Sequence, residues 1–291
     1  MKPAPFEYYR PNTIDEALAL LAEHGGDAKP LAGGQSLIPA MNFRLAMPAV
    51  LVDLNALNEL AYIKDGAQGL QLGGMTRQRA VERSAVIARE TPLVSETMPF
   101  IAHPAIRNRG TVGGSLAHAD PAAELPAVML ALNATFGLRS SKASRSVPAG
   151  EFFVGLFSTA IEPGELLAEI TIPKAAKRSG FAFQEISRRH GDFALVGVAA
   201  SVALDDTGKC AHARIALLSV GDRPMLAEHA ASALNGQVSS GEAIRAAAEA
   251  AASHDIDPSS DIHASARYRR QLASVLTRRV LDRAFARALN P

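Results

Sequence analysis

The sequence predicts an α+β protein in which a two-part N-terminal region is followed by a C-terminal domain with a three-stranded antiparallel sheet and helices. Two observations predict this class. In the first half, short apolar runs bounded by Gly and Pro alternate with helical patterns, whereas in the second half strand-like runs precede helical ones. A basic, small-residue segment at 174–180 resembles a linker. We therefore expect units at 1–58, 59–174 and 180–291.

The predicted elements of the first unit begin with a helix at 12–23. Thr13 and Glu16 form a capping box at its start, and Gly25-Gly26 stops it. A strand at 29–32, a helical turn at 37–41 and a buried strand at 49–54 complete this part.

The second unit is predicted to start with a hairpin of 62–64 and 70–74, joined by a five-residue connection. Thr76 is expected to cap a helix that runs through Glu82, and the helical pattern at 86–100 is broken by Pro92. Three further strands are expected, at 134–138, 145–147 and 166–172.

The third unit is predicted to be an antiparallel meander of strands 181–187, 195–204 and 212–220. The helices that follow are expected at 225–234, at 241–252 behind a Ser239/Glu242 capping box, and at 265–289. Five arginines of the last helix form either a solvated face or a partner-binding surface: Arg269, Arg270, Arg278, Arg283 and Arg287.

The composition is that of an ordinary globular protein, with 48% hydrophobic and 20% charged residues among 291. Basic and acidic residues are interspersed and the formal charge is +1, so a nucleic-acid partner is not expected. No apolar run approaches the ~18 residues of a membrane span, and the N-terminus lacks the apolar core of a signal peptide. We expect a cytoplasmic protein.

Two Gly-Gly pairs repeat one pattern, in which an apolar run leads to the glycines and a small hydroxyl follows. The first segment is Lys29-Pro30-Leu31-Ala32-Gly33-Gly34-Gln35-Ser36-Leu37 and the second is Thr111-Val112-Gly113-Gly114-Ser115. Because glycine lacks a Cβ, its main-chain N–H groups can approach an anion closely, and successive N–H groups can bind a diphosphate. Each pair alone could be an ordinary tight turn. Their duplication suggests one ligand bound at both places.

Several charged residues lie near the second pair. Arg107 and Arg109 could neutralise a phosphate or be solvated loop charges. His118, Asp120 and Glu124 follow the pair, and carboxylates beside a diphosphate would repel it, so we expect them to meet a ribose hydroxyl or a ring N–H.

Cysteine and histidine usage points away from metals in this chain. Cys210 is the single cysteine, so the chain alone cannot form a disulfide, a four-cysteine zinc site or an iron–sulfur cluster. The eight histidines include no HExxH motif or ligand-spaced cluster. Redox chemistry would therefore need an organic cofactor.

These motifs resemble the FAD-binding medium subunit of molybdenum hydroxylases, which includes the medium subunit of carbon monoxide dehydrogenase and the FAD subunits of xanthine dehydrogenases. The resemblance rests on both Gly-Gly segments, on the run from His118 to Pro126, on Arg188-Arg189-His190-Gly191-Asp192-Phe193-Ala194, and on the arginine pairs near the end. It covers essentially the whole chain and implies a two-part FAD-binding domain of the vanillyl-alcohol-oxidase type.

The resemblance also implies a set of residues around a non-covalent FAD. The two Gly-Gly segments, 29–37 and 111–115, would line the diphosphate, with Ile101 and Ala102 adding contacts. His118, Asp120 and Glu124 would lie near the cofactor, Glu124 at a position where relatives commonly have Asp. Leu167 and Phe193 would lie near the isoalloxazine. Many relatives carry Lys near 184 or 185, where this chain has Gln184-Glu185, which puts a cationic contact to the flavin in doubt.

The function implied by the resemblance is electron transfer within a heteromeric enzyme. A large subunit with molybdopterin would hydroxylate the substrate, a small subunit with two [2Fe–2S] clusters would pass electrons on, and this chain would deliver them from FAD to an external acceptor. The assembly is expected to be a heterotrimer, which can itself dimerise. No side chain here would be catalytic. The alternatives are a self-sufficient flavin oxidase of the same fold and a nucleotide-binding assembly module without redox activity.

Overall fold

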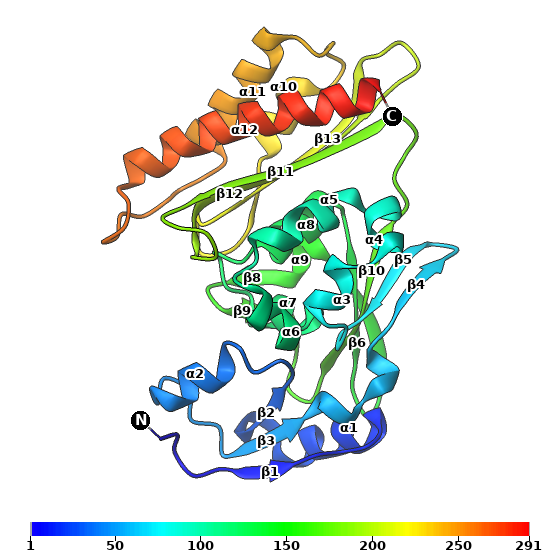
Figure 1. Cartoon of the computed structure of the whole chain (residues 1–291), viewed down its shortest axis with the longest axis vertical. Helices are drawn as coiled ribbons and strands as arrows, with labels where there is room; N and C mark the ends of the chain where they lie inside the picture. The colour runs from blue at the N-terminus through cyan, green and yellow to red at the C-terminus, as the bar shows by residue number, and fades with distance from the viewer. Residues whose placement is uncertain (1, 291) are drawn as a thin grey trace.

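The computed structural model describes residues 2–290, arranged as three layers of structure along the long axis of the molecule (Figure 1). The N-terminal strands lie at one end, the helices and strands of the middle of the chain follow, and the C-terminal sheet with its helices lies at the other end. Mixed α+β architecture with a separate C-terminal region is confirmed.

The first layer is a parallel sheet with strand order β1-β3-β2. Its strands are β1 (Glu7–Tyr9), β2 (Ala28–Leu31) and β3 (Val50–Asp53), and the helices of this layer are α1 (Ile14–His24) and α2 (Leu37–Asn42). Helix α1 starts where the Thr13 hydroxyl accepts the Glu16 N–H at 3.2 Å. It ends at Gly25, whose φ of +52° is accessible mainly to glycine. Its apolar side, including Leu18 and Leu21, packs into the core of this layer.

The second layer is an antiparallel sheet with strand order β4-β5-β10-β6-β7. Its strands are β4 (Ile63–Gly66), β5 (Gly69–Gly73), β6 (Thr135–Arg139), β7 (Ser144–Pro148) and β10 (Leu166–Pro173), and a separate hairpin is made by β8 (Phe153–Gly155) and β9 (Ser158–Thr159). The helices are α3 (Gln78–Glu82), α4 (Ala85–Glu90), α5 (Pro92–Thr97), α6 (Pro104–Arg109), α7 (Val112–His118), α8 (Glu124–Ala131) and α9 (Ala149–Phe152). Helix α8 is buried along its whole length and packs against strands β12 (Ala194–Leu204) and β13 (Cys210–Leu218) of the C-terminal sheet as well as against its own layer.

The third layer is an antiparallel sheet with strand order β11-β12-β13-β14. The strands are β11 (Ser179–Ser187), β12 (Ala194–Leu204), β13 (Cys210–Leu218) and β14 (Met225–Leu226), and the helices are α10 (Glu228–Leu234), α11 (Gly241–His254) and α12 (Ala266–Leu289). Gly180 lets α12 lie directly on β11, because a Cβ there would be 1.9 Å from the Ala284 carbonyl oxygen. The predicted sheet of three strands therefore gains a fourth, β14, from residues expected to start a helix.

The two faces of strand β11 bury different parts of the molecule. Phe181 and Phe183 point into the core shared with the second layer, whereas Ala182 points into the core under the C-terminal helices. Alternate residues of a strand face opposite sides of the sheet. The boundary between the second and third layers is therefore a continuous hydrophobic core.

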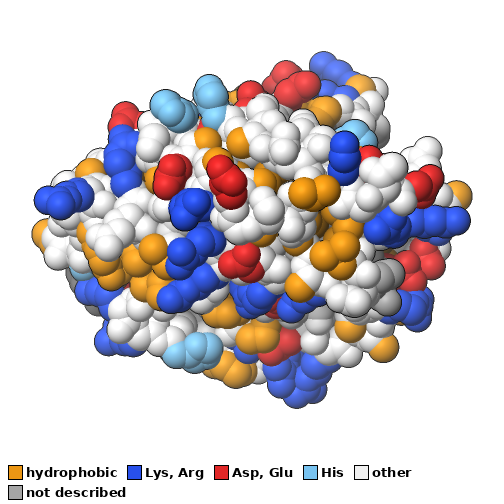
Figure 2. Space-filling model, turned by 90° about the horizontal axis from the view of Figure 1, so that it is seen from above, with side chains coloured by type: hydrophobic (Ala, Val, Ile, Leu, Met, Phe, Trp, Pro, Cys, Tyr) orange, Lys and Arg blue, Asp and Glu red, His pale blue; other side chains and the backbone are white. Residues whose placement is uncertain are grey.

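The arginines of α12 mostly bind main-chain carbonyls of this chain. Arg283 donates to the Phe183 carbonyl at 2.6 Å, and Arg270 donates to the Ile256 carbonyl at 2.9 Å. Arg269 is buried and donates to the Ser219 carbonyl at 3.2 Å and to Asp261 at 2.7 Å. The prediction of a solvated face or a partner surface is thus wrong for Arg269. Around them, on the face seen in Figure 2, basic side chains are interspersed with acidic and hydrophobic ones.

Some predicted details differ from the structure. The connection between β4 and β5 is shorter than predicted, because the strands continue to Gly66 and Gly69. Thr76 does not cap α3, because its hydroxyl donates to the Tyr62 carbonyl, and Arg77 occupies the cap position. Helix α11 is capped by Ser240, one residue after the predicted Ser239. Within residues 2–290, no helix has the length and apolar character that a bilayer crossing requires.

Candidate functional site

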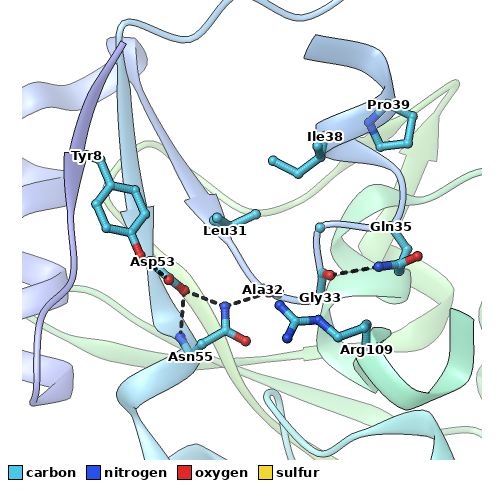
Figure 3. A pocket seen from close by; sticks show the side chains of 11 residues that line it. Tyr8, Leu31, Ala32, Gly33, Gln35, Ile38, Pro39, Asp53, Asn55 and Arg109 are labelled. Atoms are coloured by element: carbon cyan, nitrogen blue, oxygen red, sulfur yellow. Dashed lines mark hydrogen bonds between the residues drawn. The ribbon is translucent and has the colours of Figure 1, made fainter. Parts of the chain in front are cut away.

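A pocket of about 360 Å³ lies where the first Gly-Gly segment leaves the parallel sheet (Figure 3). It is lined by Tyr8, Asp53, Asn55 and Arg109, by Leu31, Ala32, Gly33, Gly34 and Gln35 of the predicted segment, and by Ile38 and Pro39 of α2. Neighbouring parallel strands end at the same edge of a sheet. The loop after β2 and the residues after β3 therefore meet here.

The first Gly-Gly segment presents unused main-chain donors. Among the described residues, the N–H groups of Gly33, Gly34, Gln35 and Ser36 have no hydrogen-bond acceptor in the chain. Gly34 has a φ of +74°, which turns successive N–H groups into a concave arrangement of the kind that binds anions. The loop has the chemistry that a diphosphate requires.

The second Gly-Gly segment is the first turn of helix α7 and not a loop. Thr111 caps it, and the donors of the pair are already used within the chain: Gly113 N–H donates to the Gly74 carbonyl at 2.9 Å and Gly114 N–H to Thr111 Oγ1 at 3.0 Å. The Ser115 N–H donates to the Thr111 carbonyl at 3.2 Å. The two segments are therefore similar in sequence but differ in backbone structure: the first is a loop and the second is the start of a helix.

Glycine at these positions allows the two segments to touch. A Cβ on Gly33 would lie 2.5 Å from the Arg109 carbonyl oxygen, and a Cβ on Gly114 would lie 3.3 Å from Ala32 Cβ. A Cβ on Gly113 would lie 2.5 Å from the Gly74 carbonyl oxygen. The two segments, far apart in the sequence, are thus side by side in the fold.

A polar network that the sequence did not reveal joins the two segments. Asn55 donates to the Ala32 carbonyl at 2.9 Å and accepts from Arg77 at 2.6 Å, and Arg77 also donates to the Arg109 carbonyl. Asp53 accepts from Tyr8 and from Asn55. Burial opposes ionisation of Asp53, but these hydrogen bonds hold its pKa below the ordinary value. In the sequence, the only indication of this network is that Asp53 and Asn55 stand at the end of a buried strand.

The two arginines before the second segment have different environments. Arg107 is buried and binds Glu82 through two nitrogens, at 3.0 and 2.9 Å, so it is neither a solvated charge nor free for a phosphate. Hydrogen bonds from Arg107 lower the pKa of Glu82 below its ordinary value. Arg109 lines the pocket beside the first Gly-Gly segment. Neither of the two alternatives considered for this pair, a phosphate contact or a solvated charge, therefore holds for Arg107.

The polar residues after the second segment lie at increasing depth. His118 is half-buried at the end of α7, and burial lowers its pKa, with a smaller contribution from the ammonium of Lys29. Asp120 is partly exposed, whereas Glu124 is buried at the start of α8.

The remaining predicted cofactor contacts are spread over several elements. Ile101 and Leu167 are buried, while Ala102 adopts a φ of +44° in the turn before α6. Phe193 is 67% exposed. Pro30 lies on β2, Leu37 begins α2 and Val112 begins α7. Contact of each predicted residue with the cofactor stays a prediction.

The chain matches two family models in succession. Residues 4–175 match the FAD-binding domain found in molybdopterin dehydrogenases, and residues 181–284 match the C-terminal domain of the carbon monoxide dehydrogenase flavoprotein. Together the two models cover nearly all of the chain.

Individual relatives match along the full length. The alpha subunit of the 6-hydroxypseudooxynicotine dehydrogenase complex of Paenarthrobacter nicotinovorans is 45% identical over 99% of this chain and 97% of the relative. The carbon monoxide dehydrogenase medium chain of Afipia carboxidovorans is 41% identical, with 100% of both chains covered.

Solved structures of such complexes superpose closely. A chain of carbon monoxide dehydrogenase from Hydrogenophaga pseudoflava matches with a TM-score of 0.95 at 39% identity, covering 99% of each chain. A chain of quinoline 2-oxidoreductase from Pseudomonas putida 86 matches with a TM-score of 0.93 at 40% identity, covering 99% of this chain and 100% of that one.

Proposed function

The chain belongs to the family of FAD-binding medium subunits of molybdenum hydroxylases, and from this premise we propose that it accepts electrons from an iron–sulfur subunit on FAD and passes them to an external acceptor. It is one subunit of a redox enzyme, and its cofactor is FAD. The bound flavin supplies the ability to take up two electrons and release them to another carrier.

The observation that carries the proposal is the junction of the two Gly-Gly segments beside the pocket. The unused N–H groups of 33–36 provide several donors for a diphosphate, and the Arg109 side chain lines the same pocket as a positive charge. The second segment supports the first by packing against it, since Gly114 approaches Ala32. We propose that 33–36 hold the diphosphate and that α7 forms the wall of the site.

The protein part of the function is then to bind, orient and shield the cofactor. Phe193 and Leu167 are proposed to contact the flavin ring. Ile101 and Ala102, in the turn before α6, are proposed to add contacts near the diphosphate. His118 and Asp120 are proposed to face polar groups of the cofactor. No side chain of this chain is assigned a catalytic role. The division into units 1–58, 59–174 and 180–291 stays a prediction.

The partners follow from the assembly of the family. Relatives are named as subunits of multi-subunit enzymes, so this chain works in a heteromeric complex. We propose a small subunit with [2Fe–2S] clusters and a large subunit with molybdopterin as its partners. The single cysteine, Cys210, is buried in β13, which is consistent with clusters held by another chain.

The proposal is tested by following the flavin absorbance of the purified complex. With a substrate of the large subunit added under anaerobic conditions, the flavin absorbance should bleach, and an added acceptor should restore it. The chain purified without partners should carry FAD but stay oxidised with the same substrate. Bleaching of the isolated chain by an organic substrate would instead identify a self-sufficient oxidase, and a chain without flavin would identify an assembly module.

A further inference from the structure

Two acidic side chains are buried where the third layer packs on the second. Glu124 is the first residue of α8 and is 8% exposed, and Glu185 on β11 is 9% exposed. The turn before α8 is held on the C-terminal sheet, because the Ser219 N–H donates to the Pro121 carbonyl at 2.9 Å. Helix α8 packs against both β12 and β13.

The surroundings of Glu185 are apolar. It lies on the same face of β11 as Phe181 and Phe183, which belong to the core shared with the second layer. Its partner across the sheet is Gly197, where a Cβ would lie 3.2 Å from Glu185 Cβ and 2.6 Å from a methyl group of Leu218. One carboxyl oxygen, Oε2, has no hydrogen-bond partner among the described residues.

The nearby cations are engaged by other groups. The positive charge of Arg107 favours ionisation of Glu124, but Arg107 is bound to Glu82 by two hydrogen bonds, at 3.0 and 2.9 Å. The negative charge of Asp120 opposes ionisation of Glu124.

On the neighbouring elements the charged groups are also paired. Glu96 of α5 binds Arg283, at 3.4 Å, and Arg287 of α12, and Arg214 of β13 donates to the Leu130 carbonyl at 3.0 Å. Within residues 2–290, neither Glu124 nor Glu185 forms an ion pair. A carboxylate that is buried without a cation loses hydration, and a second negative charge in the same boundary opposes its ionisation, so ionising both is costly.

We propose that Glu124 and Glu185 form a proton-binding site, in which the two carboxyls together hold at least one proton near neutral pH and keep the third layer docked on α8. With one of the two carboxyls protonated, one negative charge at most is buried. The site does not depend on the flavin, and it therefore stands apart from the proposed function.

The pKa shifts agree in direction with this arrangement. Burial raises the pKa of Glu185 to about 8, with the charge of Glu124 adding to the effect. Burial also raises the pKa of Glu124 to about 7. A carboxyl with a raised pKa in the folded chain stabilises the fold fully below the unfolded pKa, and that contribution is lost as pH rises through the folded pKa. Stability should therefore fall between about pH 5 and pH 8.

The test compares urea unfolding of the full-length, FAD-loaded chain and its Glu185→Gln variant between about pH 5 and pH 8.5. The slope of unfolding free energy against pH should show that the wild type releases about one proton more on unfolding than the variant does in this range. Glu96→Gln is the matched control: it removes a carboxylate from the same boundary between layers, but one paired with arginines, so it should shift stability by a similar amount at every pH in the range.

A second measurement needs no variant. Carboxyl carbon NMR of the wild-type chain with labelled glutamate should show two side chains that titrate well above the ordinary glutamate pKa. Equal slopes for the wild type and Glu185→Gln would overturn the proposal. So would an NMR titration in which every glutamate is ionised by about pH 6, which is above the ordinary glutamate pKa.

Discussion

Replacing Gly33 by alanine is expected to weaken FAD binding by forcing the two Gly-Gly segments apart. The φ of Gly33 is not positive, so the effect is steric. The added Cβ would lie 2.5 Å from the Arg109 carbonyl oxygen and 2.8 Å from Gly110 Cα, both main-chain atoms that cannot rotate away. Ordinary contact begins at 3.4 Å, so the backbone must separate by 3.4 − 2.5 = 0.9 Å.

Overpacking of this kind costs about 1–3 kcal/mol. If the cost falls on the bound conformation of the loop, the Kd for FAD rises by roughly 5-fold to 150-fold. Titration of the apoprotein with FAD, followed by flavin fluorescence, measures this change. Gly150→Ala is the control, because Gly150 is exposed and a Cβ there meets nothing within 4 Å. A Gly33→Ala chain that binds FAD within about twofold of the wild type would refute the steric reasoning, since 1 kcal/mol already corresponds to about fivefold.

Further predictions concern a buried arginine, a buried thiol and a helix cap. Arg107→Gln removes a buried cation from Glu82 and leaves Glu82 paired only with Arg79, so it should lower the unfolding free energy by about 1.5–3 kcal/mol in urea. Arg89→Gln at an exposed pair should cost less than about 1 kcal/mol. Equal costs would contradict the stabilising role of the buried Arg107. Because hydrogen bonds from Arg107 lower the pKa of Glu82, the wild type should lose this contribution as pH falls below about 4.5, and the variant should show a weaker acid dependence. Cys210 should react with a thiol reagent at pH 8 only after unfolding, because burial raises its pKa to about 11; fast labelling of the folded chain would show that the thiol is accessible. Thr13→Ala removes the helix cap and should lower the unfolding free energy by about 1 kcal/mol, measured by urea titration, and an unchanged midpoint would mean that the cap is not stabilising.

Local pattern was sufficient for most elements of the fold. The capping residue Thr13, the helix break at Pro92, which begins α5, and the strands around residues 50, 70 and 170 depend on neighbours in sequence, and the sequence placed them within a few residues. Prediction failed where a side chain had a partner distant in sequence. Thr76 looked like a helix cap, but its hydroxyl is used by Tyr62.

The candidate site shows the same division. The sequence singled out Gly33 and Gly114, but it could not show that the amides of one pair are free while those of the other are bonded to Gly74 and Thr111. Likewise, Arg107 and Arg109 are two residues apart in the sequence, yet one faces Glu82 and the other lines the pocket. These outcomes depend on which atoms are brought near by the fold.

The sequence by itself determined most of the longer helices and strands, the two glycine segments and the family, because periodicity, turn residues and motifs act through neighbouring positions. Only the tertiary structure decided that Gly33 touches the backbone before α7, and that Glu124 and Glu185 share one apolar boundary between layers. The physical reason is that hydration and charge pairing depend on three-dimensional surroundings, and a residue type carries neither on its own.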